Sequence, residues 1–337
     1  MKAIGYQRCL PVEDIHALQD IDLEAPHASG HDILVEIQAI SVNPVDYKVR
    51  LNIPPDEGQW KVIGWDAVGI VKDVGDKVTL FEKGNKVWYA GDLNRPGSYA
   101  QYQLVDERLV GCMPQSLSYS EAAALPLTTI TAWEMLFNRL QIPTEETEIP
   151  KTVLVIGAAG GVGSIMVQLL RKLTHTTVVA TASREESVQW LKDLGVHYII
   201  NHNKVLSEEL QAIGIPQVDY VISLNNTEEH YKEIVRSIAP QGHFGLIDDP
   251  SHLDVMQLKS KSVTIHWEFM FTRSMFHTPD MVEQHRLLNA VSRMIDNGEI
   301  KTTLTHHLGQ INAENLRKAH AMLESKEAYG KIVLEGF

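Results

Sequence analysis

The stretch VLVIGAAGGVGSIMVQLLRKL, residues 153–173, decides the fold of this chain. An apolar run leads directly into a glycine-rich loop, and the loop leads into a pattern typical of an amphipathic helix. The loop has the spacing A-x-G-x-x-G, with Ala158 where the strict dinucleotide fingerprint has its first glycine. Gly160 would let the backbone approach a pyrophosphate, and Gly163 would let the helix pack closely on the strand.

This context predicts a nucleotide site, with a purely structural glycine turn as the alternative. A strand before the loop and a helix after it are what dinucleotide binding requires, whereas a glycine triplet alone is weak. The loop residues that we expect at the cofactor are Gly157, Ala159, Gly160, Gly161, Val162 and Gly163.

Apolar runs alternate with polar or helical segments after this loop. They lie at 196–200, 218–224, 243–247 and 263–270. Such alternation predicts right-handed βαβ units and therefore an α/β fold with a doubly wound parallel sheet of the Rossmann type. The run VTIHWEFM (263–270) would also suit an edge strand that pairs across a homodimer.

The first 120 residues have a different pattern. DILVEIQAISV (32–42) alternates as a half-buried strand does, and similar runs follow with turn residues between them. This part predicts a small β-rich domain. Near the other end we expect a helix with Thr278 as its N-cap and Pro279 at its first position, a second helix at 313–324 and a final strand, GKIVLEG.

We expect this tail to return to the β-rich domain. Residues 1–125 and 276–337 would then form the β-rich domain, and residues 126–275 the nucleotide-binding domain. A length of 337 residues fits two domains.

The composition excludes several classes of protein. Apolar residues make up 44% and charged residues 22%, as in a folded globular protein, which argues against intrinsic disorder. The 30 basic and 43 acidic side chains give a net charge of −13, which disfavours nucleic acid and anionic membranes as partners. Only Cys9 and Cys112 are present, too few for a disulfide framework or a four-cysteine zinc lobe. With no signal peptide or long apolar run recognisable, we expect a cytoplasmic location.

The end of the second strand of the nucleotide-binding domain determines the choice of cofactor. NAD-selective sites place Asp or Glu there, whereas this chain has Thr-Ala-Ser-Arg at 181–184. Ser183 can donate to a 2′-phosphate and Arg184 can pair with it, which favours NADPH. Alternatively Arg184 is a solvated residue at a helix start, and Glu185 and Glu186 weaken its field.

Other cofactor contacts are expected at the ends of later strands. Ser223 and Leu224 end the strand after the second crossover, where the cofactor ribose lies in a doubly wound sheet. Ile247 ends the next strand, where backbone groups commonly meet the nicotinamide.

Five motifs in order resemble the medium-chain dehydrogenase/reductase superfamily, in its quinone-oxidoreductase-like branch. They are SVNPVDYKVR (41–50), GWDAVGIV (64–71), GSYAQYQLVDE (97–107), AAALPLTTITAWEML (122–136) and VLVIGAAGGVG (153–163). The tail, with FTRSMF, EQHRLLN and GKIVLEG, is similar to a subgroup labelled zinc-type alcohol dehydrogenase-like or arginate-lyase-like. The resemblance covers essentially the whole chain. It implies a GroES-like catalytic domain beside a Rossmann domain, with NADPH in the cleft, and Thr131 of the TAW triplet facing the nicotinamide.

The resemblance also allows a test for zinc. Zinc alcohol dehydrogenases have a cysteine where this chain has Asn43, a histidine where it has Trp65 and a glutamate where it has Asp66. Trp65 has no lone pair to donate and Asn43 is a poor zinc ligand. The cysteines of the structural zinc loop are also missing around GDLNRPGSYA (91–100). We therefore expect no metal, although the subgroup label keeps a zinc-type alcohol dehydrogenase as an alternative.

Without a Lewis acid, an activated C=C bond or a quinone is the easier hydride acceptor, because the substrate carries its own electron sink. We expect an NADPH-dependent reductase of quinones or α,β-unsaturated carbonyl compounds, acting on a small, apolar, conjugated substrate. The candidate catalytic residues are Asn43, Tyr47 and Lys48, which could place an N–H or O–H near an enolate oxygen. Trp65, Tyr89, Trp267 and Phe271 could line the substrate pocket.

Two further alternatives remain open at this stage. A non-catalytic NADPH-binding redox sensor would bind the cofactor without turnover. A lyase is suggested only by the subgroup label, and no acid–base pair for β-elimination is evident in the sequence.

Overall fold

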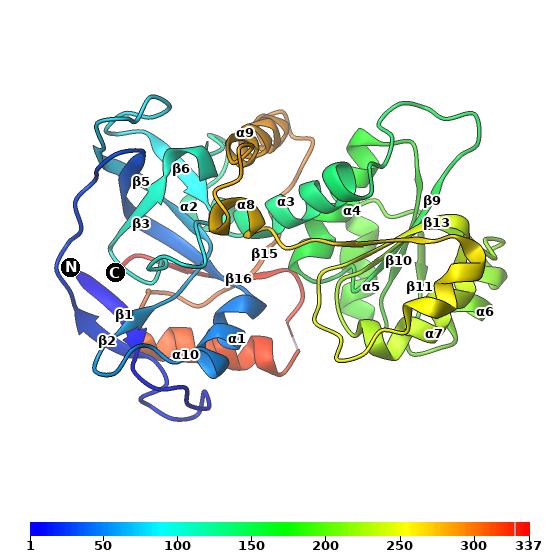
Figure 1. The fold of residues 1–337 in the computed structure, drawn as a ribbon, viewed down its shortest axis with the longest axis horizontal. Coiled ribbons are helices and arrows are strands. Elements are labelled where there is room, and N and C mark those ends of the chain that lie inside the picture. Colours follow the sequence, from blue (N-terminus) through cyan, green and yellow to red (C-terminus); the bar gives the residue numbers. More distant parts are fainter. Residues whose placement is uncertain (327) are drawn as a thin grey trace. The chain divides into compact units, whose positions relative to one another are not determined.

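The computed structural model describes residues 1–326 and 328–337 and divides the chain into two compact units (Figure 1). Unit 1 comprises Met1–Ile130 and Phe271–Phe337, and unit 2 comprises Thr131–Met270. The sequence predicts these boundaries after residue 125 and before residue 276. The tail belongs to unit 1, so unit 2 is an insertion in a discontinuous unit.

The described part of unit 1 is built on two sheets. The larger, seven-stranded sheet has the order β15-β16-β3-β5-β6-β8, with β7 also paired to β3, and the smaller has the order β2-β1-β4. The strands are β1 (Lys2–Tyr6), β2 (Gln19–Asp22), β3 (Asp32–Val42), β4 (Lys61–Val62), β5 (Ala67–Val74), β6 (Lys86–Tyr89), β7 (Tyr102–Asp106), β8 (Val110–Cys112), β15 (Leu304–His307) and β16 (Lys331–Glu335).

The central strand β3 explains how distant segments meet. Along most of β3 buried side chains alternate with half-buried ones, as its sequence predicts, and the last residues are buried on both faces because further segments cover them. β16 pairs antiparallel with β3, with Ile332 opposite Val42. This register brings Lys331, at the start of β16, to the end of β3.

Helices and short turns complete unit 1. They are α1 (Pro44–Asn52), a 3₁₀ turn (Glu107–Leu109), α2 (Tyr119–Ala123), α3 (Pro126–Trp133), which continues into unit 2, α8 (Thr272–Met275), α9 (Val282–Asp296) and α10 (Ala313–Glu324).

The predicted start of α9 was wrong. Met281, not Thr278, is its N-cap. The Arg273 guanidinium pairs with Asp280 at 2.9 Å, and the Met281 N–H donates to the Thr278 carbonyl at 3.1 Å. Residues 278–281 therefore form a turn, and the helix begins after it, at Val282.

Unit 2 is a doubly wound α/β unit. Its six strands are all parallel, as the strand–helix alternation predicts, and the structure gives their order as β11-β10-β9-β12-β13-β14. They are β9 (Thr152–Ile156), β10 (Thr177–Thr181), β11 (Tyr198–Ile200), β12 (Val218–Ser223), β13 (Ile238–Leu246) and β14 (Thr264–Trp267). The chain order reverses between β9 and β12, and β14 forms an edge of the sheet.

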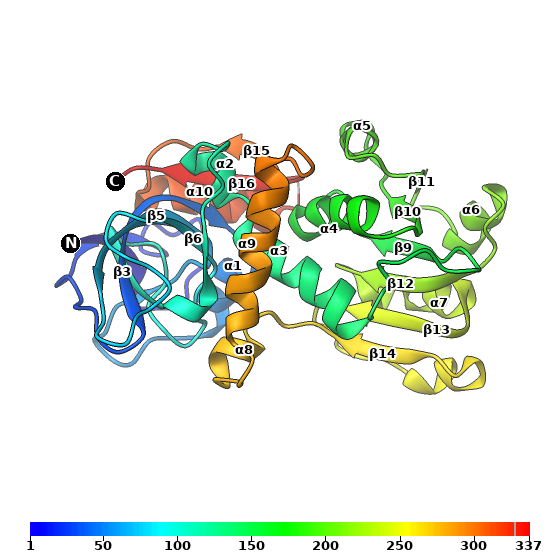
Figure 2. The ribbon, with the colours of Figure 1, turned by 90° about the horizontal axis from the view of Figure 1, so that it is seen from above.

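The helices of unit 2 cover this sheet. They are a π-helical turn (Glu134–Arg139), α4 (Gly161–Leu173), α5 (Glu185–Asp193), α6 (Leu206–Ala212), α7 (Thr227–Ser237) and a 3₁₀ helix (Val255–Lys261). α4 packs against β9 and β10, while α7 packs against β12, β13 and α6 (Figure 2). Apolar residues such as Leu154, Val221 and Phe244 are fully buried there. The fold class expected from the sequence is confirmed.

Among residues 1–326 and 328–337, no helix has both the length and the apolar composition needed to cross a membrane.

Candidate cofactor site and a buried polar network

The glycine loop of unit 2 joins β9 to α4. Gly157 directly follows the strand with φ +79°, a left-handed conformation that favours glycine. At Gly163 a Cβ would lie 2.3 Å from the backbone oxygen of Ala158, so only glycine lets α4 pack this closely on the loop. Two glycines of the loop are therefore required by the fold itself.

Gly160 differs from these two glycines. It is the N-cap of α4 with φ −72° and ψ 179°, which any residue can adopt. A Cβ at Gly160 would meet only the backbone oxygen of Gly157, at 3.5 Å, so the fold leaves it open space. The first N–H groups of a helix lack intrahelical partners and favour anions, so the N-terminus of α4 can bind phosphate groups.

The other candidate cofactor residues of unit 2 gather at the same edge of the sheet, because parallel strands all end there. The N–H of Leu224, after β12, donates to the Ile156 carbonyl at 3.1 Å, and the N–H of Ile247, after β13, donates to the Ser223 carbonyl at 3.3 Å. Ser183 and Arg184 follow β10, with Ser183 half-buried and Arg184 exposed. Thr131, buried in α3, lies at the start of unit 2.

Two neighbours of this edge were not predicted from the sequence. The His202 Nε2 lies 3.1 Å from the Ser183 hydroxyl, and its ring lies 6.2 Å from that of His230. Burial lowers the pKa of both imidazoles, and for His202 the charges of His230 and Arg184 add to the effect. Asn225 is the other: its carboxamide oxygen lies 2.6 Å from where a Gly157 Cβ would stand. His202 and Asn225 each come shortly after the end of a strand. That position was the signal that could have identified them, because the residue type alone does not.

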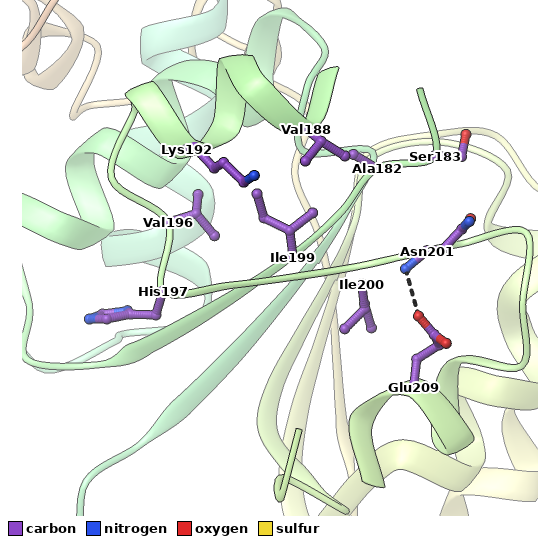
Figure 3. A pocket seen from close by; sticks show the side chains of 10 residues that line it. All are labelled: Ala182, Ser183, Val188, Lys192, Val196, His197, Ile199, Ile200, Asn201 and Glu209. Atoms are coloured by element: carbon purple, nitrogen blue, oxygen red, sulfur yellow. Dashed lines mark hydrogen bonds between the residues drawn. The ribbon is translucent and has the colours of Figure 1, made fainter. Parts of the chain in front are cut away.

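A hollow of about 450 Å³ borders this edge (Figure 3). It runs along β11 between α5 and α6, with apolar walls from Val188, Ile199 and Ile200 and with Ser183 at its margin. The Asn201 N–H donates to Glu209 at 3.1 Å and closes one side. The hollow thus adjoins the segment expected to select the cofactor.

Unit 1 buries a polar cluster around Asn43, the N-cap of α1. The Asn43 Nδ2 donates to Asp66 Oδ2 at 2.8 Å, and the Lys331 ammonium donates to Asp66 Oδ2 at 3.0 Å, to the Val42 carbonyl at 3.1 Å and to Asn43 Oδ1. The Leu127 N–H donates to Asp66 Oδ1 at 2.8 Å. Asn43, Asp66 and Lys331 are 1%, 0% and 4% exposed.

Burial raises the pKa of Asp66, while the Lys331 charge acts against that rise. All three of its partners, two side chains and the Leu127 backbone N–H, are donors, so the carboxylate form of Asp66 satisfies the cluster.

A second buried feature of unit 1 is a chain of hydrogen bonds that begins at Asp46 in α1. Asp46 Oδ2 accepts from the Asn43 N–H at 2.6 Å and from the Tyr99 hydroxyl at 3.0 Å. The Tyr99 oxygen lies 3.2 Å from His320 Nε2, and the Arg50 Nε donates to His320 Nδ1 at 3.2 Å. Because Nδ1 accepts, the His320 proton sits on Nε2 and donates to Tyr99. Every hydrogen bond therefore has a fixed direction toward Asp46.

Burial shifts the pKa values of two groups in this chain of hydrogen bonds. It raises the pKa of Asp46 to about 7 and lowers that of His320 to about 3. Asp46 Oδ1 has no hydrogen-bond partner among the described residues, so no donor stabilises that oxygen. This chain of hydrogen bonds fixes the first turn of α1, the helix that carries Tyr47 and Lys48. Tyr47 is half-buried and Lys48 is exposed.

The expected pocket aromatics fall in both units. Trp65, Tyr89 and Phe271 are buried in unit 1, and the Trp65 and Phe271 rings meet edge to face at 6.0 Å. The Trp65 indole N–H donates to the Asp92 carbonyl at 3.1 Å. Trp267, on β14 of unit 2, is 55% exposed.

The residues of this cluster do not fit a zinc ion. Among the described residues, no three His, Cys, Asp or Glu side chains lie close enough to hold a metal. Of Asn43, Trp65 and Asp66, Asp66 alone has a side chain of a kind that commonly binds zinc. Both of its carboxylate oxygens are already hydrogen-bonded.

Comparisons with known proteins agree with both units. An alcohol dehydrogenase GroES-like domain matches residues 29–115, and a zinc-binding dehydrogenase family matches residues 194–334. A zinc-type alcohol dehydrogenase-like protein of Staphylococcus epidermidis is 38% identical over 336 residues, 99% of each chain. The predicted GroES-like character of the β-rich unit is thus confirmed.

Solved structures extend the comparison. A Rhizobium etli protein, provisionally described as a zinc-dependent alcohol dehydrogenase, is 55% identical with a TM-score of 0.97, covering 100% of this chain and 98% of its own. The Escherichia coli quinone oxidoreductase complexed with NADPH shares the fold, with a TM-score of 0.83 at 22% identity, covering 99% of this chain and 100% of its own.

Proposed function

The chain belongs to the medium-chain dehydrogenase/reductase superfamily, in its quinone-oxidoreductase-like branch, and from this premise we propose that it is a zinc-independent, NADPH-dependent reductase of quinones or α,β-unsaturated carbonyl compounds. The superfamily makes it an oxidoreductase with a nicotinamide cofactor. The choice of NADPH, of the substrate class and of a metal-free reaction is our proposal.

The observation that carries the proposal is the open space at Gly160. A Cβ there meets only one backbone oxygen, at 3.5 Å, so the fold does not require this glycine. Close approach of a pyrophosphate to the backbone, at the N-terminus of α4, does require it. Ser183 and Arg184 after β10 carry the preference for NADPH, since the strand end lacks the carboxylate that a ribose 2′-hydroxyl would need.

The substrate class follows from what unit 1 lacks. No residue set for a Lewis-acid metal surrounds Asp66 in the described chain, so an alkoxide would lack the metal that stabilises it in a zinc enzyme. A quinone or an enone carries its own carbonyl as the electron sink. NADPH, when bound, supplies the hydride, and the protein supplies binding, orientation and a proton for the developing enolate oxygen.

Tyr47 and Lys48 are our candidates for that proton. Both lie in α1, whose start is fixed by the buried chain at Asp46. Asn43 is 1% exposed, and both ends of its carboxamide are bonded within unit 1. We therefore assign Asn43 to holding α1 in place.

We further propose a cytoplasmic homodimer. The exposed Trp267 and Phe269 at edge strand β14 are the surface that favours pairing of two copies.

The test combines cofactor titration with turnover. Apo protein is titrated with NADPH and NADH, and NADPH oxidation is then followed at 340 nm with a small panel of quinones and enones. Selective NADPH binding with turnover is the expected result, and turnover should survive treatment with a chelator. Tight NADPH binding without turnover would favour a redox sensor, whereas zinc that leaves together with activity would favour an alcohol dehydrogenase.

A further inference from the structure

Lys331 is a lysine in the interior of unit 1. It is 4% exposed, and its ammonium donates to three oxygens: Asp66 Oδ2, Asn43 Oδ1 and the Val42 carbonyl. Burying an ammonium is unfavourable unless a charge and further acceptors compensate it. The chain provides both, from segments that lie 265 and 288 residues away in the sequence.

The cluster gives the Asn43 carboxamide one possible orientation. Its oxygen faces the Lys331 ammonium and its nitrogen faces the Asp66 carboxylate. Turning the amide over would set an NH₂ group against the ammonium and an oxygen against the carboxylate, so two attractive contacts would become two repulsive ones. The ion pair thus orients a neutral side chain.

The same contacts leave no room for a divalent cation. Asn43 Oδ1 and Asp66 Oδ2 already face a positive charge, and Asp66 Oδ1 already accepts from the Leu127 N–H. A metal would have to displace the ammonium or sit beside it, and like charges at that distance repel strongly in a buried site. The family matched by residues 194–334 is described as zinc-binding, yet in this chain that segment delivers Lys331.

We propose that the Lys331 ammonium is a built-in cation that replaces a metal in this site and acts as a positioning residue for Asn43 and, through it, for α1. Asn43 is the N-cap of α1, and its backbone N–H donates to Asp46 Oδ2 in the first turn. The carboxamide contacts hold Asn43, and its backbone N–H holds Asp46, in the helix that carries Tyr47 and Lys48. The effect on turnover rests on the proposed reductase function, whereas the effects on metal binding and on α1 do not.

A simpler role for Lys331 is neutralisation of Asp66. Two variants separate the roles. Lys331→Met removes the ammonium and leaves a buried carboxylate, which endangers folding. The double variant Asp66→Asn with Lys331→Met removes both charges, so that folding no longer depends on the pair. Lys318→Met, at an exposed lysine of α10 paired with Glu314, is the matched control.

The first readout is hydrogen exchange of the α1 amides, measured by mass spectrometry on peptides covering residues 41–52. In the folded double variant we expect exchange in the first turn of α1 to be faster by about tenfold or more, because Asn43 has lost its fixed orientation. The Lys318→Met variant should match the wild type. Wild-type exchange in the double variant would overturn the positioning role.

The second readout is kinetic and uses the same variants. The double variant should regain the wild-type melting temperature while kcat falls by about 10–100-fold and the Kd for NADPH stays unchanged. Recovery of both stability and kcat would reduce Lys331 to a neutralising partner. If the wild type itself turns over no quinone or enone, the proposed function fails, and the exchange and metal readouts still decide the role of Lys331.

The third readout is metal content. Wild-type protein incubated with excess Zn²⁺ and then desalted should retain no stoichiometric zinc by elemental mass spectrometry. One zinc held per chain would show that the ammonium does not replace a metal.

Discussion

Adding one methyl group at Gly160 separates the cofactor role of the glycine loop from its structural role. The backbone at Gly160, with φ −72° and ψ 179°, accepts alanine, and the new Cβ would meet the Gly157 oxygen at an ordinary 3.5 Å. Alanine is a poorer N-cap than glycine but restricts the unfolded chain, and these two effects oppose each other. We expect Gly160→Ala to change the free energy of unfolding by less than about 1 kcal/mol.

The effect on the cofactor should be much larger. The methyl group would stand where a pyrophosphate approaches the N-terminus of α4 and would remove one charge-assisted hydrogen bond, worth about 1.5–3 kcal/mol. At about 1.4 kcal/mol for each factor of ten, the Kd for NADPH should rise roughly 10–100-fold.

Isothermal titration calorimetry with NADPH measures this change, and the melting temperature monitors the fold. Adenosine 2′-monophosphate is the matched control ligand, because it carries the 2′-phosphate without a pyrophosphate, and its affinity should be unchanged. A wild-type Kd for NADPH in the variant would refute the reasoning. Equal weakening of both ligands would instead indicate general damage to unit 2.

Three further changes test other parts of the structure. Gly163→Ala places a Cβ 2.3 Å from the Ala158 oxygen, so the free energy of unfolding should fall by roughly 3 kcal/mol and the melting temperature with it. An unchanged melting temperature would contradict the close packing. Arg184→Gln should raise the Kd for NADPH about tenfold and leave that for NADH unchanged, whereas equal changes would remove Arg184 from 2′-phosphate recognition. Burial raises the pKa of Asp46 from 3.8 to about 7, so its contribution to stability is fully present below 3.8 and is lost as the pH rises toward 7. Asp46→Asn should remove up to about 4 kcal/mol of this decline in the free energy of unfolding, so the plot of melting temperature against pH becomes flatter. Parallel plots for the wild type and the variant would disprove it.

Local patterns predicted much of the fold. DILVEIQAISV is β3 and residues 313–324 are α10, because alternation and helical periodicity are properties of short segments. The parallel, doubly wound sheet of unit 2 followed from the repeated strand–helix pattern. The start of α9 did not follow, because the Met281 N–H bonds the Thr278 backbone carbonyl in a turn instead of being capped by the Thr278 hydroxyl.

The candidate site was predictable only where one segment supplies it. The glycine loop is local, so its residues could be named from the sequence. The cluster of Asn43, Asp66 and Lys331 depends on the antiparallel register of β16 on β3, which a single sequence does not reveal. The lysine in GKIVLEG was therefore not singled out, although it is the residue that completes the cluster.

The discontinuous form of unit 1 has a consequence for biosynthesis. Because Thr131–Met270 separates its two parts, the ribosome delivers Asn43 and Asp66 long before Lys331. Unit 2 is a contiguous stretch and can collapse while synthesis continues. Until Lys331 emerges, the Asp66 carboxylate lacks the ammonium that compensates its burial, so burying Asp66 is unfavourable. We therefore expect the core of unit 1 to close only when β16 has been synthesised.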